Sequence, residues 1–142
     1  MQLKDIMTEG VETITPDSTI ADAAETMRNL DIGALPVCDG RRLVGMLTDR
    51  DIAVRAVAEG RDPTKTRVSS CMSPEVLYCF EDQEAEEAER LMQQKQIRRL
   101  PILDRDKNLI GIVALADIAT RIDDPEETAR TIREISQLAP AH

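Results

Sequence analysis

The stretch Leu35-Pro36-Val37-Cys38-Asp39 leads, after a polar turn, into Leu43-Val44-Gly45-Met46-Leu47. The same pattern returns later in the chain as Leu100-Pro101-Ile102-Leu103-Asp104 followed by Leu109-Ile110-Gly111-Ile112-Val113. Each copy predicts two β-strands joined in a hairpin, because runs of apolar and β-branched residues flank a short polar turn. The fold is therefore expected to be built from a duplicated unit.

The similarity between the two halves extends beyond the hairpins. Met7 aligns with Met72, and after a one-residue insertion at Asp106 the alignment continues with Asp51 opposite Asp117. A duplicated half-domain cannot easily cover its own apolar face, so we expect the two copies to pack together and to form clefts along their seam. That seam is the place where we expect function.

Length and charge limit the possible classes of protein. The chain has 142 residues, enough for one sizeable core, which the duplication divides into units of roughly 60 residues that are each marginal alone. Acidic residues number 27 against 18 basic ones, for a net charge of -9. Because this charge opposes a polyanion and aromatic residues for base stacking are scarce, we expect no nucleic-acid partner.

Other classes of protein lack their usual signals in this sequence. We find no secretion signal and no apolar run long enough to cross a bilayer, so we expect a cytoplasmic protein with no membrane partner. The three cysteines have no disulfide or zinc spacing, and we expect no metal site. Each aligns with an apolar residue of the other repeat, so we expect Cys38, Cys71 and Cys79 to be buried as small hydrophobic side chains.

The sequence offers little to a catalytic mechanism. The only histidine is His142 at the last position, so no Ser/His or Cys/His arrangement can form within an ordered core. No glycine-rich phosphate loop is present either. We therefore predict no catalytic residues and no enzyme activity.

Hydrophobic periodicity predicts the same order of elements in each repeat: strand, helix, strand, strand, helix. In the first repeat the predicted elements are a strand at 11–15, an N-cap within 16–18, a helix at about 20–30, strands at 35–38 and 43–48, and a helix from 49 toward 59 that stops at Gly60. In the second repeat they are a strand at 76–80, a helix at 83–95, strands at 100–103 and 109–114, and a helix from 115.

Three further segments complete the predicted organisation, which divides the chain into repeat one at 1–60, a connector at 61–70, repeat two at 71–122 and a C-terminal part at 123–142. Asp124-Pro125-Glu126-Glu127 predicts the start of a C-terminal helix, with Ala129, Ile132 and Ile135 on one face. The helix at 83–95 carries an acidic outer face that we expect to be solvated, formed by Glu84, Glu86, Glu87 and Glu89.

The duplicated pattern resembles a tandem CBS domain pair, or Bateman module, of the stand-alone bacterial kind. The residues that carry the resemblance are Ile32-Gly33-Ala34-Leu35-Pro36, Thr48-Asp49-Arg50-Asp51-Ile52 and the connector Ala58-Glu59-Gly60-Arg61-Asp62-Pro63, within a match that covers about 3–122. The resemblance implies an α/β (α+β) fold of two β-α-β-β-α repeats with pseudo-two-fold symmetry, to which the sequence pattern adds the C-terminal helix. It also implies an adenosyl effector (AMP, ADP, ATP, NAD or S-adenosylmethionine) and no obligatory cofactor, although some members bind nothing known.

Thr48 and Asp51 have two possible roles. In CBS modules a Ser/Thr-x-x-Asp segment holds an adenosyl ribose, and a carboxylate can accept hydrogen bonds from two vicinal hydroxyls. The alternative is a capping box at a helix start. In repeat two the hydroxyl is replaced by Ala114 while Asp117 is retained, and an acid without its capping partner is harder to explain as a cap. The resemblance therefore implies ribose ligands at Asp51 and Asp117, in two unequal clefts.

Arg98 and Arg99 stand where repeat one has Gly33 and Ala34. The resemblance implies that such basic residues reach across the seam to the phosphates of a nucleotide whose ribose the other half holds, and an arginine fork suits that task. The small Gly33 and Ala34 would leave room for a ligand near the backbone. The alternative is that both arginines are exposed charges that offset an acidic protein.

The opening strands complete the candidate site. By resemblance, Val11 and Thr13, with Val76 and Tyr78, border the adenine, and the alternative for each is ordinary strand packing. The sequence thus predicts a regulatory module that binds an adenosyl ligand, forms a homodimer and signals to an unknown protein. The competing hypothesis is a ligand-free dimerisation or scaffold module.

Overall fold

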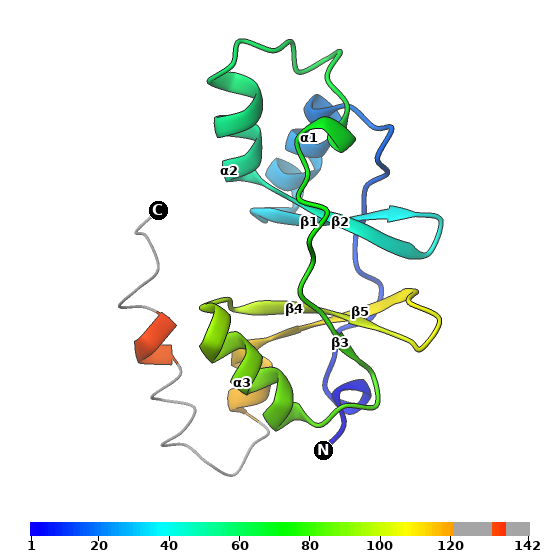
Figure 1. Cartoon of the computed structure of the whole chain (residues 1–142), viewed down its shortest axis with the longest axis vertical. Helices are drawn as coiled ribbons and strands as arrows, with labels where there is room; N and C mark the ends of the chain where they lie inside the picture. The colour runs from blue at the N-terminus through cyan, green and yellow to red at the C-terminus, as the bar shows by residue number, and fades with distance from the viewer. Residues whose placement is uncertain (121–131, 136–142) are drawn as a thin grey trace. The chain divides into compact units, whose positions relative to one another are not determined.

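The chain folds into two compact units, seen in a computed structural model that describes residues 1–120 and 132–135 (Figure 1). The repeat-one unit is Glu12–Val76, and the repeat-two unit is Met1–Val11 together with the chain from Leu77 onward. The mixture of helices and small sheets confirms the predicted α+β class. Among the described residues, no helix is long and apolar enough to cross a membrane.

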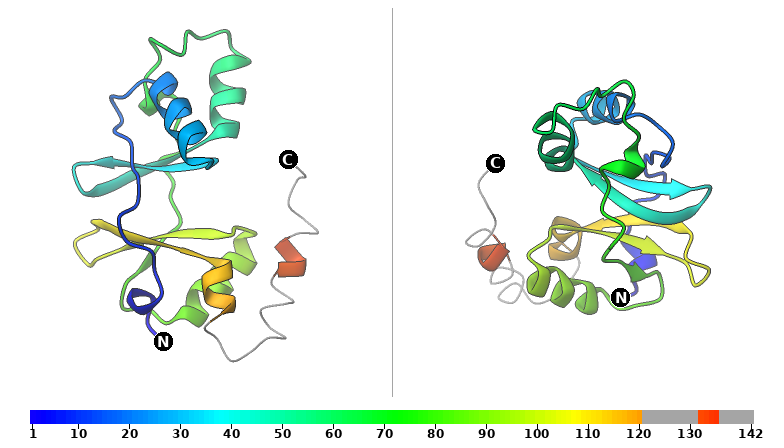
Figure 2. Two further views of the ribbon diagram at one scale, coloured as in Figure 1. Left: turned by 180° about the vertical axis from the view of Figure 1, so that it is seen from behind. Right: turned by 45° about the horizontal axis from the view of Figure 1, so that its top comes forward.

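The repeat-one unit is a β-hairpin covered on one face by helices (Figures 1 and 2). Strands β1 (Ala34–Asp39) and β2 (Arg42–Thr48) pair antiparallel around the predicted turn. Helix α1 (Ile20–Leu30) precedes them, and α2 (Asp49–Ile52) follows and continues as the π-helical turn η2 (Ala53–Val57). The chain leaves this helix at Gly60, whose φ of 71° suits glycine, and the short 3₁₀ turn η3 (Val68–Ser70) follows later.

The repeat-two unit has the same plan with one more strand. Its sheet runs β3-β4-β5, with β3 (Cys79–Phe80) parallel to β4 (Arg99–Leu103) and β4 antiparallel to β5 (Leu109–Ala114). Helices α3 (Ala85–Lys95) and α4 (Leu115–Ala119) lie on one face of the hairpin (Figure 2). The 3₁₀ turn η1 (Leu3–Asp5) and the helical residues 132–135 also belong to this unit.

Each unit takes in the short segment with which the other repeat begins. Thr8 exchanges two backbone hydrogen bonds with Ile112 of β5, at 2.8 and 3.0 Å, and Ser73 makes the equivalent pair with Met46 of β2, both at 2.9 Å. The neighbouring glycines allow this approach, because a Cβ on Gly45 would lie 2.9 Å from the Ser73 carbonyl oxygen and one on Gly111 would lie 3.0 Å from the Thr8 carbonyl oxygen. The compact units therefore do not coincide with the sequence repeats.

The apolar residues of the predicted pattern form one core in each unit. Ile20, Leu35, Val37 and Leu47 are fully buried in the repeat-one unit, as Ala88, Met92, Leu100, Ile102 and Ile118 are in the repeat-two unit. Burying each large aliphatic side chain contributes about 1.5–3 kcal/mol. The helix periodicity predicted the buried face of α1 correctly at Ile20, Ala23 and Met27, but Ala24 and Leu30, predicted on the same face, are exposed.

Several predicted boundaries are wrong. Residues 11–15 form no named strand, because only Ile14 exchanges backbone hydrogen bonds with β1. Strand β3 is likewise limited to two residues. The N-cap of α1 is Thr19, just after the predicted 16–18, and its hydroxyl accepts from the Asp22 amide at 3.2 Å. The predicted start of the C-terminal helix at 124–127 lies outside the described residues.

The acidic face of α3 also needs a correction. Glu84, Glu86 and Glu87 are exposed as predicted, but Glu89 is fully buried. Gln93 lies one helical turn after Glu89 on the same face and donates to Glu134 at 2.8 Å. This face is therefore contacted by the segment 132–135 from far along the chain, which the periodicity of α3 alone does not reveal.

Candidate ligand site

Thr48 and Asp51 lie at the junction of β2 and α2 and bind each other reciprocally. The Asp51 amide donates to Thr48 Oγ1 at 3.0 Å, and the Thr48 amide donates to Asp51 Oδ2 at 2.9 Å. This is the capping box that the sequence offered as an alternative. The cap uses one carboxylate oxygen and the acceptor side of the hydroxyl, so the hydroxyl proton and further acceptor lone pairs remain for a ligand.

Asp117 makes half of the same arrangement. Its Oδ2 accepts from the Ala114 amide at 3.1 Å, at the start of α4. Contrary to the prediction, Asp117 acts as a cap without a hydroxyl partner, because its carboxylate accepts from the backbone amide by itself. Retention of the acid in both repeats consequently says less about a ligand than the sequence suggested.

Gly33 and Ala34 lie beside Thr48. Ala34 pairs with Thr48 across the β1–β2 hairpin, and the Asp49 amide donates to the Gly33 carbonyl at 2.9 Å. A Cβ on Gly33 would come within 3.0 Å of Asp49 Oδ2, so the small residue accommodates that exposed carboxylate. Four of the predicted residues are thus gathered around the start of α2.

Arg98 and Arg99 form the matching corner of the repeat-two unit. The Leu115 amide donates to the Arg98 carbonyl at 2.8 Å, and Arg99 pairs with Ala114 across the β4–β5 hairpin. Both arginines are exposed. They line a cavity of about 340 Å³ whose other walls are Ala114, Leu115, Ala116 and Ile132. This cavity combines two cationic side chains with an otherwise apolar lining, and Ile132 is a lining residue that the sequence interpretation missed.

The four residues predicted to border the adenine flank the two points where the chain passes from one unit to the other. Val11 ends the first segment of the repeat-two unit and Val76 ends the repeat-one unit, while Thr13 and Tyr78 lie two residues beyond each crossover. Thr13 is exposed and the other three are half-buried. All four therefore keep surface that a ligand could contact.

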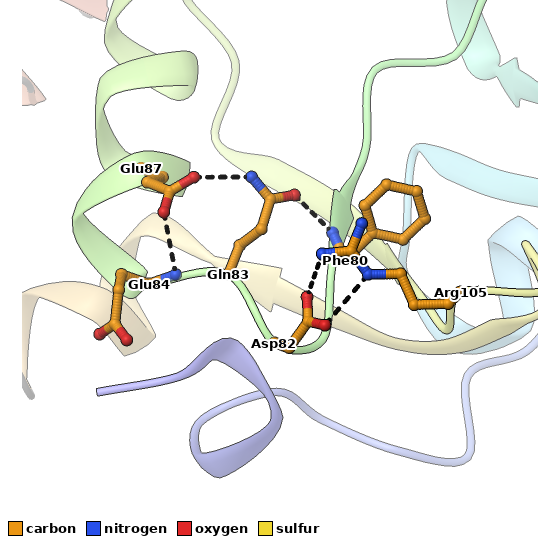
Figure 3. A network of polar contacts seen from close by, with 6 residues as sticks. All are labelled: Phe80, Asp82, Gln83, Glu84, Glu87 and Arg105. Atoms are coloured by element: carbon orange, nitrogen blue, oxygen red, sulfur yellow. Dashed lines mark hydrogen bonds and ion pairs between the residues drawn. The ribbon is translucent and has the colours of Figure 1, made fainter.

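Tyr78 is held by a neighbouring network that the sequence interpretation did not include. Its ring meets Phe80 edge to face, with centroids 5.4 Å apart, and the Arg105 guanidinium lies 4.2 Å from the Phe80 centroid. Arg105 donates twice to Asp82, at 2.7 and 3.0 Å (Figure 3). These hydrogen bonds lower the pKa of the Asp82 carboxyl below its usual value.

The same loop leads into α3 through further hydrogen bonds. The Phe80 amide donates to Gln83 Oε1 at 2.8 Å, and Gln83 Nε2 donates to Glu87 Oε2 at the same distance (Figure 3). Glu87 also accepts from the Glu84 amide at 3.5 Å. The network therefore connects β3, which directly follows Tyr78, to the first turn of α3.

The cysteines are buried as predicted. Cys38, Cys71 and Cys79 are all free thiols within the cores. Burial raises the pKa of Cys79 to about 11 and also raises that of Cys38. Within residues 1–120 and 132–135, no cluster of three metal-ligating side chains is found.

The predicted site residues thus fall into two groups, one in each unit. The repeat-one group contains the hydroxyl and carboxyl of Thr48 and Asp51, and the repeat-two group contains Arg98, Arg99 and Asp117. The predicted convergence of Asp51 with the arginines concerns both units and stays a prediction.

Comparison with known proteins follows the duplication. The family model for the CBS domain matches the chain twice, at 3–57 and 68–124. The CBS domain-containing protein YhcV of Bacillus subtilis is 46% identical over 134 residues, which are 94% of each chain. Hypoxic response protein 1 of Mycobacterium tuberculosis is 38% identical over 122 residues, 85% of each chain.

Solved structures show the same fold. A crystal structure of Hypoxic Response Protein I, which holds two coordinated zinc ions, has a TM-score of 0.77 and 38% identity over 86% of this chain and 99% of that one. A crystal structure of CBSX2 in complex with AMP has a TM-score of 0.73 and 26% identity over 93% of this chain and 98% of that one. The predicted resemblance to stand-alone CBS pairs is confirmed.

Proposed function

We propose that this chain, which belongs to the CBS domain family and carries that domain twice, is a regulatory module whose effector is an adenine nucleotide or another adenosyl compound. The proposal includes a cytoplasmic homodimer that passes its state to a protein partner, without catalysis. The observation that carries it is the junction of β2 and α2, where hydrogen bonds of 3.0 and 2.9 Å from backbone amides fix the Thr48 hydroxyl and the Asp51 carboxyl. An adenosyl ribose requires such a fixed acceptor for its two hydroxyls.

The geometry of the first group supports a role for Asp51 in ribose binding. The capping box fixes the rotamers of both side chains before any ligand arrives, so little conformational entropy is lost on binding. Asp51 is half-buried, which strengthens a charge-assisted hydrogen bond relative to one in water. The AMP found in CBSX2 supports an adenosyl ligand in this family.

The second group supplies charge for the phosphate. Arg98 and Arg99 are two adjacent cations on the edge of a cavity in a chain with a net charge of -9. Because nucleotides are anionic and the protein as a whole repels anions, local cations are needed for affinity. We propose that Arg99, and with it Arg98, contacts a phosphate by a bidentate hydrogen bond.

The scaffold hypothesis has one specific observation in its favour. The hydrogen bonds that Asp51 and Asp117 accept from backbone amides at the helix starts explain both acids without any ligand. The effector hypothesis is favoured by the two adjacent arginines on the cavity edge, because an arginine fork suits a phosphate. The two hypotheses therefore differ in whether a nucleotide stabilises the fold.

A thermal-unfolding panel separates the hypotheses. AMP, ADP, ATP, NAD and S-adenosylmethionine are each added to the full chain, and a ligand at 100 times its dissociation constant stabilises the protein by roughly 2.7 kcal/mol. The variant Asp51→Asn retains an oxygen for the Thr48 amide and loses the charge, so we expect its fold to persist and the stabilisation to disappear. Asp62→Asn, on the connector, is the control for removing one negative charge, and we expect it to respond to ligand as the wild type does.

Arg99→Ala adds a second arm to the experiment. If Arg99 contacts a phosphate, removing the Arg99 side chain weakens the binding of ATP more than that of S-adenosylmethionine, because ATP carries phosphate and S-adenosylmethionine does not. If none of the five compounds shifts the unfolding transition, the effector proposal is refuted and the scaffold hypothesis replaces it.

A further inference from the structure

The cavity beside Arg98 and Arg99 has one wall that comes from outside the CBS repeats. Ile132 lies beyond the last residue of the second CBS match, yet it lines the cavity with residues of β4, β5 and α4. The neighbouring residues 132–135 are helical and belong to the repeat-two unit. A segment that the family fold does not require therefore completes this cavity.

Two contacts fix the segment where it lies. Ile135 is 1% exposed and belongs to the core that includes Met92 and Ile118. Glu134 accepts a hydrogen bond of 2.8 Å from Gln93 of α3. Because Ile132 and Ile135 are three residues apart on a helix, they share one face, and burial of Ile135 places Ile132 on the cavity edge.

Ile132 itself differs from Ile135 in exposure. It is 43% exposed, so it is not needed to fill the core. Its uncovered surface faces a cavity of about 340 Å³, within the range of small-molecule sites. A ligand in this cavity contacts the arginines with an anionic group and Ile132 with an apolar surface.

We propose that the segment 132–135 is a wall of a ligand cavity in the repeat-two unit, and that docking of this segment and occupancy of the cavity by a phosphate-bearing nucleotide strengthen each other. The inference rests on the proposed function and adds a means of regulation to it. Linkage requires the coupling to be reciprocal, so a bound nucleotide holds the segment in place and a displaced segment weakens nucleotide binding. A partner that captures this segment would then compete with the nucleotide.

Substitutions at Ile132 test the coupling in the full chain by calorimetric titration of ATP. Ile132→Ala removes part of the apolar wall, and we expect roughly three- to tenfold weaker binding. Ile132→Asp places a carboxylate beside the arginines, where it competes with phosphate, and we expect at least about a tenfold loss. Val57→Asp is the matched control because Val57 is 69% exposed in η2 of the other unit, and we expect affinity within about twofold of the wild type.

Amide hydrogen exchange supplies a second readout that does not depend on the substitutions. In the wild-type protein, ATP is expected to slow exchange in a peptide that covers 132–135, and Ile132→Asp is expected to remove this protection. One outcome is that ATP binds the wild type and the Ile132 variants equally well and leaves hydrogen exchange at 132–135 unchanged. That outcome refutes the role of 132–135 in the ligand cavity, while the proposed function stands. If ATP does not bind the wild type, the coupling to ATP is refuted together with this choice of effector, and the five-compound panel decides the proposed function separately.

Discussion

The starts of α2 and α4 are the same structure built with different residues. In repeat one, Thr48 and Asp51 exchange two hydrogen bonds, whereas in repeat two Asp117 caps the Ala114 amide alone. The acid therefore has a structural role in both repeats, and its duplication does not by itself indicate a ligand. The repeats differ because repeat one has the hydroxyl of Thr48 and repeat two has the cations of Arg98 and Arg99.

The largest expected effect concerns a feature that the two units share. Gly45→Ala forces a Cβ to within 2.9 Å of the Ser73 carbonyl, and Gly111→Ala forces one to within 3.0 Å of the Thr8 carbonyl. A methionine sulfur would lie closer still, at 2.8 Å from a Cβ on Gly45 and 2.7 Å from one on Gly111, but that side chain can move, whereas the backbone carbonyl cannot easily do so. We therefore expect each variant to lose about 1–3 kcal/mol of unfolding free energy in urea denaturation. The units are equivalent in this respect if the two losses agree.

Gly33→Ala is the control for that pair. Its Cβ would approach only the flexible carboxylate of Asp49, at 3.0 Å, so we expect a change within about 0.5 kcal/mol. If Gly33→Ala lost as much unfolding free energy as Gly45→Ala, close approach of the backbone would not explain why glycine is needed at position 45.

Exchanging the capping residues sharpens the difference between the two helix starts. Thr48→Ala removes the acceptor for the Asp51 amide, and we expect it to cost about 1 kcal/mol of unfolding free energy. Ala114→Thr supplies the missing hydroxyl to α4, and we expect a gain of up to about 1 kcal/mol. The comparison would be contradicted if Ala114→Thr destabilised the protein by more than Thr48→Ala does.

The smallest effect is a pH dependence of stability to which Cys79 of the repeat-two unit contributes more strongly than Cys38 of the repeat-one unit. Cys79 stands where repeat one has Ile14, and burial raises the pKa of its thiol from 9.0 to about 11. Between these values the unfolded chain has lost the proton that the folded state keeps, so this contribution to stability is present below pH 9 and falls as the pH rises toward 11. Urea denaturation at pH 8, 9, 10 and 11 is expected to show a shallower decline for Cys79→Ala than for the wild type.

A decline of equal slope in both proteins would mean that Cys79 is not the group responsible. Asp62→Asn serves as a control, since the pKa of Asp62 is lowered by its hydrogen bonds to Thr64 and this carboxyl does not titrate in that range.

The elements that were predicted correctly are those specified by local sequence. Strand alternation located both hairpins, and a period of 3.6 located the buried faces of α1 and α3. Cysteine burial followed from the alignment of the repeats with each other. The capping box at Thr48 was one of two roles that its sequence pattern allowed, and both roles remain compatible with the observed geometry.

The features that were missed depend on contacts between residues far apart in sequence. No local pattern indicates that Ser73 pairs with β2 or that Thr8 pairs with β5, since each belongs to the first residues of the other repeat. Glu89 looked solvated because α3 was read without the segment 132–135. The same segment brings Ile132 to the cavity beside Arg98 and Arg99. The sequence next to Glu89 or Ile132 predicts neither contact.

The central claim is that Thr48 and Asp51 do more than begin a helix, and calorimetric titration of AMP into wild type, Asp51→Asn and Asp117→Asn tests it most directly. The account predicts binding to the wild type, at least about a tenfold loss for Asp51→Asn, and a smaller loss for Asp117→Asn. Equal AMP affinity in all three proteins would contradict it, because the carboxyl of Asp51 would then act as a helix cap alone.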